Sequence, residues 1–140
     1  MYNIDRFVVA QKMSYKTALD EIKGGFKQTH WIWYIFPQLK GLGKSQMSEY
    51  YGIENADEAM EYWHNEYLKN NLIEISEELL KFNTSQLSFV IGDADAVKVR
   101  SCMTLFHFVA PGCETFNRVI KKFFNGEWDH KTFEMLREMD

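Results

Sequence analysis

The stretch His30-Trp31-Ile32-Trp33-Tyr34-Ile35-Phe36-Pro37-Gln38 decides how this chain folds. It places four aromatic side chains in the six positions from Trp31 to Phe36, and a proline closes the run. Such a segment avoids water on every face, so we expect a short buried helix that ends before Pro37. A polar residue stands at each border, His30 before the aromatics and Gln38 after the proline. The segment therefore forms either the middle of a core or the wall and rim of a ligand pocket, and the sequence leaves both open.

On both sides of this stretch, apolar residues recur at helical spacing, and no useful run alternates with period two. On the N-terminal side we expect two helices, the first capped by Asn3 and the second by Ser14. On the C-terminal side, Asn55 begins a capping-box pattern that predicts a helix start. The apolar stripe then continues over residues 56–82 as either one helix or two. We favour a break at Asn70-Asn71, because asparagine is a poor helix former.

The C-terminal half predicts three further helices. The first, which Asp93 caps, is apolar on most of its circumference from Val97 to Val109, so we expect it to be central. An amphipathic helix over residues 114–124 follows, and Asp129 caps the last one. The whole pattern predicts an all-α fold, a single compact domain over residues 1–140 with about seven or eight helices.

Composition excludes several classes of protein. A chain of 140 residues with 46% hydrophobic and 26% charged residues is typical of one globular domain. The net charge of −4 argues against a nucleic-acid partner, because phosphate binding needs a basic surface. No apolar run approaches the roughly 20 residues that a membrane span requires, and no signal peptide pattern is present. We therefore expect no membrane partner and a cytoplasmic location, while the oligomeric state stays open.

No motif predicts a metal or a cofactor, and we expect neither. Gly43-Lys44-Ser45 resembles the end of a phosphate-binding P-loop, but Gln38 stands where that pattern needs its first glycine. The two cysteines and four histidines show none of the close spacings that bind zinc.

His30 is the strongest candidate for chemistry, because imidazole titrates near neutral pH. We expect it either at the rim of an aromatic pocket or, alternatively, as a cap or a partner of a backbone carbonyl. Asp95 is the second catalytic candidate, as an orienting or second acid group. It also lies three positions before Lys98, so these two side chains can form an ion pair on one face of a helix.

An apolar pocket with a few polar groups is the common form of a ligand site. The residues that would build one here are aromatic, cationic, polar or glycine, and they are Lys27, Trp31, Trp33, Gln38, Gly41, Gly43, Lys98, Ser101 and Thr104. For Ser101 and Thr104 the alternative is a hydrogen bond to a backbone carbonyl one turn back.

Three functions remain open, and the sequence does not decide whether the protein is an enzyme. The first is a small-molecule or anion-binding domain whose aromatic pocket lies beside His30. The second is a hydrolase or transferase on a nucleotide-like small substrate, with His30 as acid or base. The third is a protein-interaction module with Trp128 and the tyrosines near Tyr50 on an exposed patch.

Ordered motifs along the whole chain resemble one known family. They are Arg6-Phe7, Ala18-Leu19, His30-Trp31-x-Trp33-x-x-Phe36-Pro37-Gln38, Gly41-Leu42-Gly43-x-Ser45, Tyr51-Gly52-Ile53, Gly92-x-x-Asp95-x-x-Lys98, Ser101-x-Met103-Thr104-Leu105-Phe106 and Gly126-x-x-Asp129-x-x-Thr132. In this order they resemble the bacterial domain-of-unknown-function family numbered eighteen-ten, whose members often carry the label calpastatin. The resemblance implies an all-helical fold and no assigned activity. The chain departs from the family's usual Gly-x-Arg-Leu run, because Asn70-Asn71-Leu72 stands there.

Overall fold

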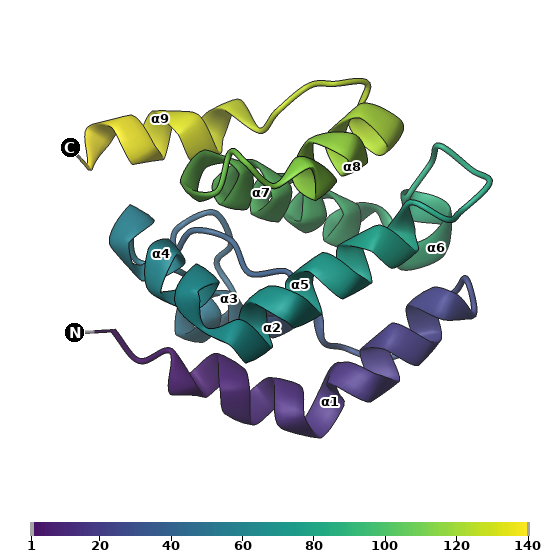
Figure 1. Cartoon of the computed structure of the whole chain (residues 1–140), viewed down its shortest axis with the longest axis horizontal. Coiled ribbons are helices and arrows are strands. Elements are labelled where there is room, and N and C mark those ends of the chain that lie inside the picture. The colour runs from purple at the N-terminus through teal and green to yellow at the C-terminus, as the bar shows by residue number, and fades with distance from the viewer. Residues whose placement is uncertain (1, 140) are drawn as a thin grey trace.

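A computed structural model describes residues 2–139, and within that range the chain forms nine helices and no strand (Figure 1). In chain order these are α1 (Asp5–Lys23), α2 (Ile32–Ile35), α3 (Gln46–Tyr51), α4 (Ala56–His64), α5 (Glu66–Leu79), α6 (Ser88–Ile91), α7 (Asp93–Val109), α8 (Glu114–Phe124) and α9 (His130–Glu138). The all-helical fold is confirmed. The expected count of seven or eight helices is too low, and the four-residue helix α6 is one that the sequence pattern did not predict.

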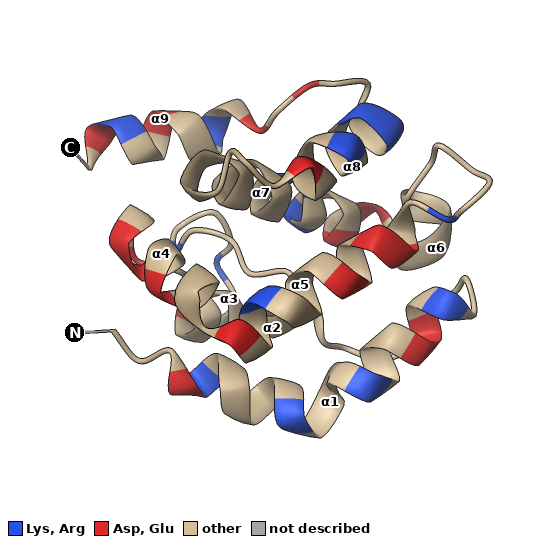
Figure 2. Cartoon of the chain, viewed as in Figure 1, with Lys and Arg blue, Asp and Glu red and all other residues tan. Residues whose placement is uncertain are grey.

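Helix α7 is the centre of the packing, as its apolar circumference predicts. Every residue from Ser101 to Phe106 is buried, and α7 contacts α4, α6, α8 and α9. Figure 2 shows charged residues on the longer helices around α7, whereas the second half of α7 and the short helices α2 and α6 carry none. A helix that is apolar on most sides is stable only when neighbours cover those sides. None of the helices in residues 2–139 has the length and apolarity needed to pass through a bilayer.

Residues 31–36, here called the aromatic block, contain the short helix that the sequence predicts. This helix, α2, ends two residues before Pro37. Its side chains are buried except one. Trp33 is only half-buried, so the expectation that every face of the block avoids water is wrong at this position.

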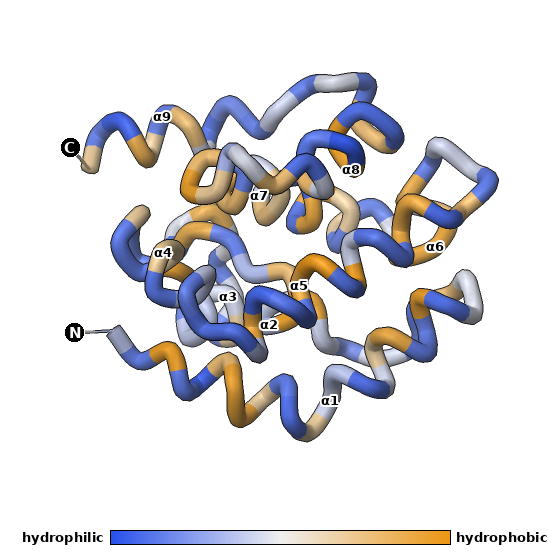
Figure 3. The backbone as a smooth tube through the Cα atoms, viewed as in Figure 1, coloured by the Kyte–Doolittle hydropathy of each residue, from blue (hydrophilic) through white to orange (hydrophobic). Residues whose placement is uncertain are grey.

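The two helices expected near the N-terminus are a single helix, α1. Ser14 lies inside it rather than capping a second helix, and the position before the helix is Ile4, not Asn3. Hydrophobic and hydrophilic stretches follow one another along α1 on both sides of its pale middle (Figure 3). The buried residues Phe7, Gln11, Ala18 and Ile22 form one stripe that continues past Ser14. Serine costs a helix only a few tenths of a kcal/mol, roughly, so one continuous buried stripe outweighs the capping signal.

Residues 56–82 contain two helices, but the break lies at Asn65 rather than at Asn70-Asn71. The side chain of Asn65 accepts a hydrogen bond from the first turn of α5 and so caps that helix. Asn71 remains inside α5 because its amide donates to Oε1 of Gln11 at 3.0 Å. Its carbonyl also accepts from the Tyr15 hydroxyl at 3.0 Å. These bonds to α1 offset the low helix propensity of asparagine.

A buried ion pair joins α1 to the first turn of α4. Nη1 of Arg6 lies 2.7 Å from Oε2 of Glu58, and the two side chains are only 8% and 1% exposed. The same guanidinium donates to the carbonyls of Tyr50 and Gly52, each at 2.9 Å. The other carboxylate oxygen of Glu58 accepts from the backbone N–H of Glu54 at 2.7 Å. Arg6 and Glu58 therefore fasten the segment between α3 and α4 to α1.

This segment also pairs with the chain that follows Pro37, through a parallel bridge between Leu39 and Ile53. The N–H of Lys40 donates to the carbonyl of Ile53 at 2.8 Å, and the N–H of Ile53 donates to the carbonyl of Gln38 at 2.9 Å. The two segments lie so close together that a Cβ atom added to Gly52 would lie 2.6 Å from Cα of Lys40. Glycine at this position is therefore a requirement of the packing.

We expect Gly52→Ala to lower the free energy of unfolding by about 1–3 kcal/mol, because the new methyl group overlaps backbone atoms that cannot move alone. Urea unfolding followed by circular dichroism measures the change. Gly112→Ala is the matched control, since nothing lies within 4 Å of a Cβ added there. Equal stability of the two variants would contradict the close approach at Gly52.

Candidate functional site

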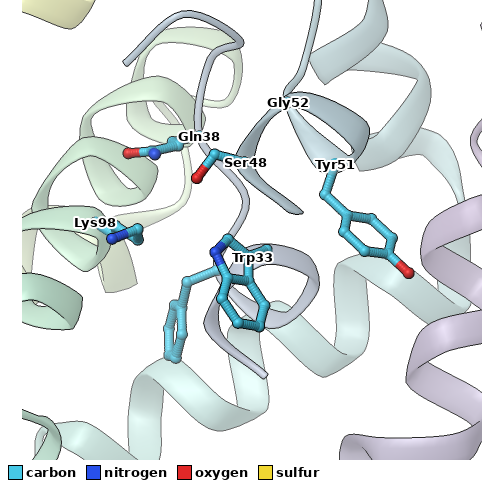
Figure 4. Close-up of a pocket in the computed structure, with 7 residues that line it drawn as sticks. Trp33, Gln38, Ser48, Tyr51, Gly52 and Lys98 are labelled. Carbon is cyan, nitrogen blue, oxygen red and sulfur yellow. The ribbon is translucent and has the colours of Figure 1, made fainter. Parts of the chain in front are cut away.

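A small pocket lies where the aromatic block, α3 and α7 meet (Figure 4). Its walls come from the aromatic block, the chain just after Pro37, the end of α3 and the first half of α7. The residues that line it are Trp33, Phe36, Gln38, Ser48, Tyr51, Gly52 and Lys98. The structure thus brings together three of the predicted ligand-binding residues, Trp33, Gln38 and Lys98.

The polar groups of the pocket are hydrogen-bond donors or can act as donors. Figure 4 shows the polar ends of Gln38, Ser48 and Lys98 on the side of the Trp33 ring that carries its indole nitrogen, whereas the Tyr51 hydroxyl points away. The hydroxyl of Ser48 accepts a hydrogen bond from that of Ser45 at 3.0 Å. Across residues 2–139, no hydrogen bond or ion pair engages the side chains of Trp33, Gln38 or Lys98. Among the described residues, no carboxylate lines the pocket.

The pocket is narrow. Its cavity volume is only about 10 Å³. Space of that size holds on the order of one water molecule. The pocket therefore suits the terminal group of a ligand, and a larger group enters only when the half-buried Trp33 and Lys98 side chains move.

The two glycines predicted to approach a ligand have different positions. Gly43 packs behind the pocket, where an added Cβ would lie 2.7 Å from Cβ of Ser48 and 3.3 Å from the amide nitrogen of Gln38. Its lack of a side chain lets these two pocket residues come close. Gly41 lies outside the pocket, in a turn with φ of 102°, where glycine is favoured.

Trp31 belongs to a second polar cluster, organised by Glu21 at the other end of the aromatic block. Oε1 of Glu21 accepts from the Trp31 indole at 2.9 Å and from the backbone N–H groups of Gln28 and Thr29, at 2.8 and 3.0 Å. Its second oxygen accepts from the Thr29 hydroxyl at 2.6 Å. Burial alone would raise the pKa of Glu21, but these hydrogen bonds, led by those from Thr29, outweigh it and lower the pKa to about 2.

Lys27 and Asp95 form an ion pair beside this cluster. Nζ of Lys27 lies 3.0 Å from Oδ2 of Asp95, with side chains 8% and 19% exposed. The same ammonium donates to the carbonyl of Thr29 and lies 4.8 Å from the centre of the Trp31 ring. The ion pair of Asp95 with Lys98 that the helical spacing allows is not observed within residues 2–139, where Asp95 pairs with a lysine from the loop between α1 and α2.

His30 is exposed, and it does not line the pocket. Its neighbours Thr29 and Trp31 both donate to Glu21, so the backbone on each side of it is held. Within residues 2–139 its side chain makes no hydrogen bond, so the alternative role of a cap is not observed either.

Ser101 and Thr104 lie further along α7, away from the pocket, and hold the chain before α9. The Ser101 hydroxyl donates to Oδ2 of Asp129 at 2.8 Å, and the N–H of Asp129 donates to the Thr104 hydroxyl at 3.0 Å. The Thr104 hydroxyl also donates to the carbonyl of Arg100 one turn back at 2.8 Å, whereas the Ser101 hydroxyl, which donates to Asp129, lies 3.3 Å from the carbonyl of Val97. The alternative prediction, a hydrogen bond to a backbone carbonyl one turn back, is therefore observed for Thr104.

The residues of the predicted interaction patch differ in exposure. Tyr50 is 58% exposed. Trp128 is half-buried, and its ring stacks on that of His107 with centroids 4.4 Å apart.

Sequence reasoning missed Ser48, Tyr51 and Gly52 as pocket residues. They reach the pocket only because the bridge between Leu39 and Ile53 brings α3 back against the aromatic block. No spacing rule predicts an isolated bridge of this kind. The one available signal was Tyr51-Gly52-Ile53, which stands among the motifs of the family resemblance.

The comparisons with known proteins agree with these motifs. A family model described as "Protein of unknown function (DUF1810)" matches residues 1–136. The chain belongs to this family. The family resemblance drawn from the sequence motifs is therefore confirmed.

A solved structure is also similar to this DUF1810 chain: that of the conserved hypothetical protein Rv1873 from Mycobacterium tuberculosis. It is 32% identical, the similarity covers 96% of each chain, and the TM-score is 0.92. No curated protein matches the chain significantly. The descriptions of the family and of this relative assign no activity.

We expect Glu21→Gln to destabilise the protein by about 1–2 kcal/mol at pH 7, because neutral glutamine is a weaker acceptor and brings donors of its own. The folded pKa of Glu21 is below its ordinary value of 4.5, so its stabilising contribution is complete above that value and disappears as the pH falls toward 2. Urea unfolding at pH values between 7 and 2 should show the two proteins converging in stability.

Glu61→Gln is the control for this experiment, because Glu61 is exposed and makes no polar contact within residues 2–139. It should track the wild type at every pH. A stability difference for Glu21→Gln that stays constant down to pH 2 would show that the carboxylate charge plays no part.

Proposed function

We propose that the pocket of Trp33, Gln38, Ser48 and Lys98 binds a small anion or the anionic end of a small molecule. One observation carries the proposal: Lys98 is half-buried at the pocket, and no hydrogen bond or ion pair within residues 2–139 engages its ammonium. A partly buried cation is costly without a partner, so a ligand that supplies negative charge there gains binding energy.

The other polar groups favour the same class of ligand. An indole nitrogen only donates, an ammonium only donates, and the Gln38 amide and Ser48 hydroxyl can each donate as well. A carboxylate or phosphate group only accepts when it is fully ionised, and charge-assisted hydrogen bonds to it are the strong ones. The absence of carboxylates among the lining residues removes the repulsion that an anion would otherwise meet.

The pocket has room for about one water molecule, so a small oxyanion or a terminal carboxylate or phosphate enters it only with a movement of the Trp33 and Lys98 side chains. The proposal is binding rather than turnover, because neither of the candidate catalytic residues, His30 or Asp95, lines the pocket. The apolar rings of Trp33 and Phe36 would exclude water around the bound group and strengthen its hydrogen bonds.

We expect Lys98→Gln to weaken binding of the anion by about 10- to 100-fold, the effect of losing one charge-assisted hydrogen bond. A thermal-shift screen with inorganic phosphate, nucleotides, sugar phosphates and small carboxylates identifies the ligand, and titration calorimetry measures the loss. An anion at 100 times its dissociation constant adds about 2.7 kcal/mol to the stability of the wild type.

Lys121→Gln is the matched control, because Lys121 is an exposed lysine on α8 outside the pocket. It should bind as the wild type does, and Lys98→Arg should retain part of the affinity. The proposal is wrong if no anion shifts the midpoint of the wild type, or if Lys98→Gln binds the anion as tightly as the control.

A further inference from the structure

We infer that Lys27 is a positioning residue for this pocket: by pairing with Asp95, it keeps Lys98 unpaired for the anion. The inference rests on the proposed function, and it concerns a residue that does not itself line the pocket. Lys27 acts through the carboxylate of Asp95, for which Lys27 and Lys98 compete.

The competition follows from the geometry of α7. Asp95 lies in the first turn of this helix, and Lys98 follows it three positions later. Side chains at this spacing are neighbours on a helix surface, and an aspartate and a lysine there attract each other. The carboxylate of Asp95 instead lies 3.0 Å from the ammonium of Lys27, and no ion pair within residues 2–139 joins it to Lys98.

Lys27 holds this position because its ammonium has further partners there. It donates to the carbonyl of Thr29 and lies over the face of the Trp31 ring. Its backbone N–H donates to the carbonyl of Val90 at 2.8 Å, which fixes the loop to α6, the helix directly before α7. Glu21 in turn holds both Thr29 and Trp31. The ammonium of Lys27 is therefore placed at Asp95 before any ligand binds.

Removing Lys27 would leave a partly buried carboxylate without its partner. Arg100, the next cation along α7, already donates to the carbonyls of Glu127 and Trp128. Lys98 is then the cation on the same helix that can turn to Asp95. When Lys98 pairs with Asp95, its ammonium is withdrawn from the pocket. When it does not, the unneutralised carboxylate of Asp95 repels an incoming anion.

The test uses Lys27→Met, Asp95→Asn and the double variant, with affinity for inorganic phosphate, or for the anion found in the thermal-shift screen, measured by calorimetry. Lys27→Met should bind about three- to tenfold more weakly than the wild type. Asp95→Asn should bind at least as tightly as the wild type. The double variant should regain wild-type affinity, because it removes the competing carboxylate.

This rescue separates the positioning role from a structural one. If Lys27 only held the loop in place, the double variant would lack the same contact and would bind as weakly as Lys27→Met. Lys16→Met is the matched control, because Lys16 pairs with Asp20 at 3.2 Å on an exposed face of α1. It should leave the affinity unchanged. Should Lys27→Met fail to fold by circular dichroism, Lys27→Gln replaces it and keeps a donor for Thr29.

A measurement without ligand distinguishes failure of this inference from failure of the proposed function. Acetylation of individual lysines, followed by mass spectrometry with Lys121 as internal standard, reports whether Lys98 is ion-paired. Labelling of Lys98 should fall several-fold in Lys27→Met and return in the double variant. Unchanged labelling and unchanged affinity in Lys27→Met overturn the positioning role. The expected labelling pattern in a protein that binds no anion supports the pairing but overturns the proposed function.

Discussion

The buried pair of Arg6 and Glu58 is the interaction on which the pocket side of this molecule depends. Two charges that are almost completely withdrawn from water are tolerated only because each neutralises the other and both make additional hydrogen bonds to the backbone. Three of those backbone contacts, to Tyr50, Gly52 and Glu54, lie between the end of α3 and the start of α4. Helix α1 therefore holds in place the segment that carries Tyr51 and Gly52, although α1 itself contributes no residue to the pocket.

Much of the fold could be predicted from the sequence where local chemistry and tertiary packing agree. The aromatic block, the cap at Asn55 and the apolar α7 are such places, because each signal lies within its own element. The predictions were wrong where a local signal met a stronger distant contact. Ser14 is a good cap but lies on a helix whose buried stripe continues past it. Asn71 is a poor helix former but is held by Gln11 and Tyr15 of another helix.

The candidate site could be predicted only in part, for a related reason. Trp33 and Gln38 follow from the aromatic block and its border, and Lys98 follows from the polar start of α7. Which lysine would pair with Asp95 depends on a loop whose path is set by tertiary contacts, and the sequence does not show that path. Residue type alone also did not separate side chains that have partners within residues 2–139, such as Ser101, from those that have none there, such as Lys98.

The bridge between Leu39 and Ile53 has a consequence for how relatives of this protein can diverge. It closes the intervening chain into a loop whose two ends meet at one point, and Ser48 lies on that loop. Lengthening a closed loop costs little entropy, on the order of 0.6 kcal/mol for each doubling. Trp33 and Lys98, on the other side of the pocket, belong to elements that the core constrains. Relatives can therefore differ in the length of this loop around Ser48, whereas Gly52, Trp33 and Lys98 are held by close packing or by the core.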